Sequence, residues 1–132
     1  MTVVLDAPAI VAIAADSRKK RTAVEMVLER EVCYMSAVAA AEAYSWLLNN
    51  AGSAFAEHWL NFLLSGRDVR VDCEIDREMI ELVGQARRQS RKVAPSGAFS
   101  AALARKLGVP LMTDDPNLED LETHHYCTIR WL

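Results

Sequence analysis

Short apolar runs with the length of strands recur along the whole chain, and stretches with helix-forming composition separate them. Five runs qualify as strands, at residues 2–5, 31–35, 69–71, 110–113 and 126–132. Strands that alternate with helices are typical of a domain built on a largely parallel sheet. We therefore expect a three-layer α/β/α fold with a central, mainly parallel sheet.

The connecting helices have recognisable ends. Ser36, Ser53 and Asp76 are expected to begin helices, the first two as N-caps, and Gly108 is expected to end one. In the helix that Asp76 begins, Ile80, Val83 and Ala86 are expected to share the apolar face. We expect helices over residues 8–15, 19–30, 36–50, 53–65, 76–92 and 95–107, with one or two turns over 116–121.

The length and composition set the class of protein. A chain of 132 residues fits a single domain spanning 1–132, and 52% apolar with 25% charged residues is an ordinary globular composition. No apolar run reaches the 18 or so residues of a membrane span, and no basic stretch precedes the first apolar run. We expect a cytoplasmic protein. The net charge of −3 is unlike that of a basic nucleic-acid-binding module.

Asp6 is the only charged residue in the first 15, and it directly follows the first strand. Ligands of open α/β sheets bind outside the carboxyl ends of the strands, so Asp6 occupies a position typical of a site. The same residue is also a possible N-cap for the next helix, and the two roles are compatible.

Glu42 is the only charge between Glu31 and Glu57, in a helix that is apolar nearly all round. Such a helix is expected to be buried, and a buried carboxylate is costly unless it is paired or binds a metal. No cation stands three or four residues away to relieve it. The alternative is a Glu42 that reaches solvent.

Asp114 and Asp115 follow the strand at 110–113, again at a carboxyl end, and Pro116 then starts a turn that one of them is expected to cap. Two strand ends and one helix would thus bring acids together. Oxygen ligands of this kind suit Mg²⁺, which often binds through one or two carboxylates and a substrate phosphate. The residues predict an acidic Mg²⁺ site that acts on phosphate.

Basic and aromatic residues are less specific signals. The cations Arg87, Arg88, Arg91 and Lys92 fit either phosphate contacts or the C-terminal end of a helix dipole. The cluster at 18–21 is interpreted as a solvated surface. Trp46, Trp59 and Phe62 are interpreted as core or dimer interface rather than as platforms for bases.

The order of these segments resembles the PIN-domain family, in particular toxins of the VapC type. Residues 4–9 (VLDAPA) resemble its opening stretch, 36–42 (SAVAAAE) its Ser-to-Glu helix, 95–110 its late helix and strand, and 111–115 (LMTDD) its L-x-T-x-D element. The resemblance covers almost the whole chain, and the ordered set is more specific than any one motif.

The resemblance implies an endoribonuclease that uses Mg²⁺ or Mn²⁺ to hydrolyse RNA. It implies that Asp6, Glu42 and Asp115 are three of four metal-binding acids, that the protein is a homodimer, and that a cognate antitoxin covers the site. Gly97 stands where the family has a further acid, and residues 93–104 contain no carboxylate. Asp114 is then a candidate substitute ligand.

Two other functions compete with this one. Gly97 favours a catalytically silent PIN domain that still binds an antitoxin or RNA. A phosphatase of the haloacid-dehalogenase type, with Asp6 as nucleophile, would need a second Asp at position 8, which is Pro. A receiver domain would need an acid at the end of its third strand and an acidic pair beside the first, and neither is evident.

Overall fold

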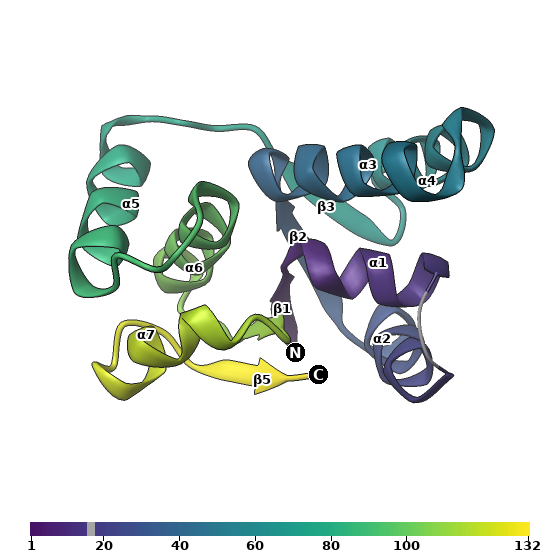
Figure 1. Ribbon diagram of the computed structural model, residues 1–132. Helices are drawn as coiled ribbons and strands as arrows, with labels where there is room; N and C mark the ends of the chain where they lie inside the picture. Colours follow the sequence, from purple (N-terminus) through teal and green to yellow (C-terminus); the bar gives the residue numbers. More distant parts are fainter. Residues whose placement is uncertain (16–17) are drawn as a thin grey trace.

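The computed structural model describes residues 1–15 and 18–132. Five strands form one sheet, and helices pack around it (Figure 1). Every strand pairing is parallel, and the strand order is β3-β2-β1-β4-β5. The strands are β1 (Thr2–Leu5), β2 (Val32–Ser36), β3 (Val69–Asp72), β4 (Leu111–Thr113) and β5 (Ile129–Trp131). The expected α/β fold is confirmed, and the described sheet is parallel throughout.

Helices cover both faces of this sheet. Helices α1 (Ala7–Ala15), α2 (Arg18–Arg30), α3 (Ala37–Ala51) and α4 (Ser53–Leu64) contribute to one core. Helices α5 (Arg77–Gln89), α6 (Pro95–Leu107) and α7 (Glu119–Thr123), with the 3₁₀ turn η1 (Pro116–Leu118), contribute to the second. In Figure 1 the α1–α2 pair and the α5–α6 pair lie on opposite sides of the sheet. None of the described helices is long and apolar enough to cross a membrane.

The strands read as continuous apolar runs because both of their faces are buried. In β1, Val3 and Leu5 belong to the core on the α1 side, whereas Val4 belongs to the core on the α6 side. Successive side chains of a strand point to opposite faces, so a strand with two covered faces needs apolar residues at every position. The carboxyl end of β1 is therefore fixed between two cores, which holds Asp6 in place.

Most of the expected helix ends are confirmed. The Ser36 hydroxyl accepts a hydrogen bond from the Val38 N–H, Asp76 caps α5, and Gly108 ends α6 with a left-handed backbone. The expected N-cap at Ser53 is wrong, because Gly52 caps α4 without a side-chain bond. Gly52 has φ of 90°, which lets it end α3 and begin α4 within one residue.

The buried face of α5 differs slightly from the predicted one. Ile80 is 60% exposed, whereas Met79 and Ala86 are buried and Leu82 and Val83 pack against the core. Met79, Leu82 or Val83, and Ala86 follow the i, i+3/i+4, i+7 spacing of a single helix face. Ile80 lies one position round from that face and points to solvent.

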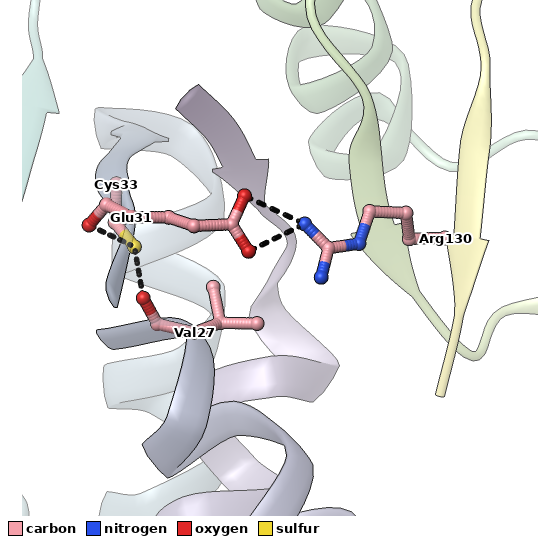
Figure 2. A network of polar contacts seen from close by, with 4 residues as sticks. All are labelled: Val27, Glu31, Cys33 and Arg130. Atoms are coloured by element: carbon pink, nitrogen blue, oxygen red, sulfur yellow. Dashed lines mark hydrogen bonds and ion pairs between the residues drawn. The ribbon is translucent and has the colours of Figure 1, made fainter. Parts of the chain in front are cut away.

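An ion pair ties the last strand to the end of α2 (Figure 2). Arg130 Nη1 in β5 lies 2.8 and 2.7 Å from the two carboxylate oxygens of Glu31, just before β2. The thiol of Cys33 in β2 lies beside it, 3.6 Å from the Glu31 carbonyl and 3.8 Å from that of Val27. Burial raises the pKa of the Cys33 thiol to about 11, with a further rise from the Glu31 charge.

Candidate active site

A cleft of about 460 Å³ opens at the carboxyl end of the sheet. Its wall comes from four separate parts of the chain, namely the β1–α1 junction, α3, the start of α6 and the segment after β4. All four acids predicted from the sequence line it, together with Gly97: Asp6, Glu42, Asp114 and Asp115. The structure thus places in one cleft residues that the sequence separates by up to 109 positions.

Asp6 is the most buried of these acids, with 2% of its surface exposed. Its two carboxylate oxygens accept hydrogen bonds from the hydroxyls of Ser100 and Thr113, each at 2.8 Å. Burial raises the pKa of the Asp6 carboxyl, and the negative charge of Glu42 raises it further, while the two hydroxyls and the Ala7 N–H act in the opposite direction. Asp6 is therefore a fixed carboxylate that lacks a cationic partner among the described residues.

Glu42 is placed differently from expectation. We expected it to be buried, but its residue is exposed, because α3 buries only the stripe that contains Ala39, Ala43 and Leu47. The opposite side of α3 forms a wall of the cleft. There Glu42 Oε2 accepts a hydrogen bond of 2.5 Å from the Ser96 hydroxyl. Glu42 also lies near enough to Asp6 for its charge to act on that carboxyl.

The two acids after β4 have different partners. Asp115 caps η1, with Oδ1 accepting from the Asn117 N–H at 2.9 Å, and its own N–H donates to the Thr113 hydroxyl at 3.2 Å. Asp114 Oδ2 lies 2.8 Å from Lys20 Nζ at the start of α2. The expected cap is confirmed for Asp115, and Asp114 has its charge balanced by a lysine.

Gly97 is buried in the first turn of α6 and lines the cleft. A Cβ atom at this position would lie 3.4 Å from a methyl of Leu118 and 3.5 Å from one of Val93, which are ordinary van der Waals contacts. Its φ lies outside the left-handed region that would favour glycine. The backbone at position 97 therefore accepts a larger residue, and its lack of a side chain is not required by the fold.

The donor set of the cleft suits a hard cation. Its wall includes Asp6, Glu42, Asp115 and Ser96, and every polar side-chain atom of these four residues is an oxygen. Within residues 1–15 and 18–132, no three acidic, histidine or cysteine side chains are close enough together to hold a metal ion. The pair Asp6 and Glu42 remains, and a cation bound by both would offset the cost of burying the Asp6 charge and its repulsion from Glu42, the two effects that raise the pKa of Asp6. The residues present thus fit Mg²⁺ bound through two carboxylates, with water and phosphate oxygens completing its shell.

Sequence reasoning missed the hydroxyls and the lysine that hold the acids. Ser96 and Ser100 are four residues apart, so they share a face of α6 and reach Glu42 and Asp6 respectively. That spacing, on a helix otherwise rich in alanine, is a signal that could have indicated them. Lys20 carries no such signal, because its contact with Asp114 spans 94 positions of sequence.

The family model of the PIN domain matches residues 3–123. A search of curated proteins gave no significant match.

Solved structures share the fold at low sequence identity. The Mycobacterium tuberculosis toxin VapC20, described as cleaving the sarcin–ricin loop, is 17% identical over 89% of this chain and 92% of its own, with a TM-score of 0.73. VapBC2 of Rickettsia felis, bound to a promoter DNA fragment, is 12% identical over 100% and 99%, with a TM-score of 0.74. A toxin–antitoxin complex of Klebsiella pneumoniae is 13% identical over 96% and 95%, with a TM-score of 0.69. The chain belongs to the PIN-domain family and has the fold of the VapC toxins.

Proposed function

We propose that this protein is a Mg²⁺-dependent endoribonuclease of the VapC toxin type, weakened by the glycine at position 97. One observation carries the proposal. Asp6, Glu42 and Asp115 come from three distant segments and converge on one cleft at the carboxyl end of a parallel sheet. A fold keeps a buried carboxylate without a cationic partner at a cost, so such a group is a good candidate for function.

The residues of the cleft have separable roles. Ser100 and Thr113 fix both oxygens of Asp6, so this carboxylate is oriented before any ligand arrives. Asp6 and Glu42 would hold a Mg²⁺ or Mn²⁺ ion, and Asp115 lines the same cleft. When bound, such an ion supplies an activated water and neutralises charge on the phosphate. Asp115 already caps η1, so its position is set by the backbone that follows β4.

The proposed partners are RNA, a cognate antitoxin and a second copy of this chain. The similar structures of Rickettsia felis and Klebsiella pneumoniae are complexes of a toxin with its antitoxin. An acidic cleft that is short of metal is a favourable socket for an arginine or lysine side chain, because a carboxylate pair accepts a guanidinium fork. We propose that the antitoxin directs such a side chain towards Asp6 and Glu42.

A second candidate is a PIN domain that binds RNA or the antitoxin without cutting. Two observations favour it. Position 97 offers no side-chain oxygen, and Asp114, the substitute ligand suggested by the sequence, is paired with Lys20. Among the described residues, only the pair Asp6 and Glu42 then remains to hold a metal, with Asp115 lining the same cleft.

Cleavage of a labelled RNA panel separates the two candidates. The protein is incubated with Mg²⁺, with Mn²⁺ and with a chelator, beside an Asp6→Asn variant as the control for contaminating nucleases. Slow cleavage that needs the metal and disappears in Asp6→Asn supports the nuclease. If no RNA is cut under any condition while the antitoxin still binds, the silent module is the correct function.

A further inference from the structure

Trp46 presents an exposed aromatic surface inside the acidic cleft. It follows Glu42 by four residues on α3, so both side chains stand on the same face of the helix. Trp46 is 41% exposed and lines the cleft, which excludes the core position considered from the sequence. An indole that stays open beside carboxylates is a platform on which a nucleic-acid base can stack.

Cations that lack partners lead up to one side of the cleft. Arg87, Arg88, Arg91 and Lys92 are exposed, and none forms a side-chain ion pair or hydrogen bond with any described residue. The helix dipole accounts only for the first two, because α5 ends at Gln89. Lys92 precedes Ala94, a residue of the cleft wall, by two positions, which is at most about 7 Å of chain.

A second basic cluster reaches the other side. The contact between Lys20 and Asp114 brings the start of α2 to the cleft, and Arg18 and Lys19 are exposed next to it. Cations in the first turn of a helix are unfavourable, because they face the positive end of the dipole. No acidic residue occupies the first turn of α2 to offset them. Within α2 itself nothing in the first turn favours these cations, whereas a bound polyanion would.

We infer that the cleft binds one single strand of RNA, with a base stacked on Trp46. Arg91 and Lys92 hold its phosphates on one side of the cleft. Arg18 and Lys19 hold them on the other side. The two clusters approach from opposite faces of the sheet, since α2 packs on one face and the α5–α6 turn on the other. A strand that spans them crosses Asp6 and Glu42 between the clusters. This inference rests on RNA as the substrate of the proposed function.

Binding of a fluorescently labelled single-stranded RNA of about 12 nucleotides, within the usual site sizes of single-strand binders, tests the stacking contact. All measurements contain a chelator, so they do not depend on metal or on cleavage. Trp46→Ala should weaken binding about 10-fold, and Trp46→Phe should keep most of the affinity, because a ring remains. Trp131→Ala is the matched control, since Trp131 is 43% exposed and does not line the cleft.

The salt dependence of the same binding tests the phosphate contacts. Each phosphate contact to a single strand contributes about 0.7 to the slope of log K against log salt, so Arg91→Gln with Lys92→Gln should reduce that slope by about 1.4. Arg18→Gln with Lys19→Gln should reduce it similarly. Arg30→Gln with Arg67→Gln removes the same charge far from the cleft and should leave the slope unchanged, because Arg30 ends α2 about 18 Å from Arg18.

The two pairs should act additively on the long RNA, and only one should act on an oligonucleotide of about 4 nucleotides, which is too short to span the cleft. Equal effects of Trp46→Ala and Trp131→Ala, or of the cleft and control charge variants, would overturn the inference. So would equally tight binding of a polyglutamate peptide, which would identify an acidic protein segment as the ligand. A protein that binds RNA as described but never cuts it leaves this inference standing and removes the proposed nuclease.

Discussion

Two carboxylates of this protein are withdrawn from water, and they are satisfied in different ways. Glu31 lies before β2 with a side chain that is 13% exposed, and Arg130 balances its charge (Figure 2). Asp6 follows β1 and is 2% exposed, and among residues 1–15 and 18–132 its polar neighbours are two hydroxyls and a second acid rather than a cation. A buried ion pair can have a purely structural role, whereas a buried acid without a cationic partner is a candidate for binding a ligand. The contrast identifies Glu31 as a structural residue and supports the proposed role of Asp6 in the site.

The largest expected effect comes from completing the acidic site. Gly97→Asp places a carboxylate in the first turn of α6, where the structure has room for its Cβ atom and the helix dipole favours a negative charge. Loss of one partner around a metal commonly costs about 10–100-fold in activity, so its return should raise Mg²⁺-dependent RNA cleavage by at least that factor. Cleavage rates of parent and variant with a chelator control measure the gain.

Gly97→Asn is the matched control, because it fills the same space without the charge. It should stay as slow as the parent, and adding Asp6→Asn to Gly97→Asp should abolish the gain. If Gly97→Asn were as active as Gly97→Asp, shape rather than charge would limit the site. An inactive but folded Gly97→Asp protein would favour the silent binding module.

Removing the cation from the structural pair should destabilise the fold. Arg130→Met leaves both oxygens of Glu31 without their partner in a largely buried position. An unsatisfied buried acceptor costs about 1–3 kcal/mol of unfolding free energy. Urea unfolding measures the loss, with Arg30→Gln as the control because Arg30 is exposed nearby. If the urea midpoint of Arg130→Met were unchanged, Glu31 would be freely hydrated. The Glu31–Arg130 pair would then have no structural role to contrast with the unpaired Asp6.

The sequence predicted the elements of this fold well because most of their signals are local. Apolar runs marked the strands, and caps such as Ser36 and Asp76 act within three residues of themselves. The errors arose where tertiary packing decides. The pattern around Ile80 fits two adjacent helix faces, and only the packing of α5 against α6 chooses between them. Gly52 replaced Ser53 as cap because the α3–α4 turn needs a positive φ.

The acids of the site were predictable from their isolation among apolar residues, but their surroundings were not. Glu42 was expected to be buried because its helix has almost no polar residue, yet the open side of α3 is the cleft itself. The hydroxyls that hold Asp6 lie 94 and 107 positions away in sequence. No local pattern links residues at that separation. Only the structure therefore shows which acid has a cationic partner and which does not.

A smaller effect is expected from neutralising Asp6. Its raised pKa means that the folded state binds a proton more tightly than the unfolded chain, so Asp6 contributes stability below its ordinary pKa of 3.8 that is lost as pH rises through its folded pKa. Asp6→Asn removes the ionised, buried group and should stabilise the metal-free protein at pH 7, by about 1 kcal/mol. The gain should fade as pH falls towards 3.8. Thermal unfolding over this pH range, in chelator, measures it; a destabilised variant at pH 7 would show that the hydroxyls outweigh the burial.

The smallest effect is expected at Glu42, and a matched variant at Asp6 separates the two acids of the cleft. Ser96→Ala removes the hydroxyl bound to Glu42, an exposed residue that water can serve instead, so the unfolding free energy should fall by only about 0.5 kcal/mol. Ser100→Ala removes a hydroxyl from buried Asp6, where water has no access, and should cost about 1–3 kcal/mol. Urea unfolding of the two variants side by side gives the difference. Equal costs would mean that Glu42 is held as firmly as Asp6. A clear difference would make Glu42 the adaptable ligand of the pair, free to turn from Ser96 towards a cation while Asp6 stays fixed.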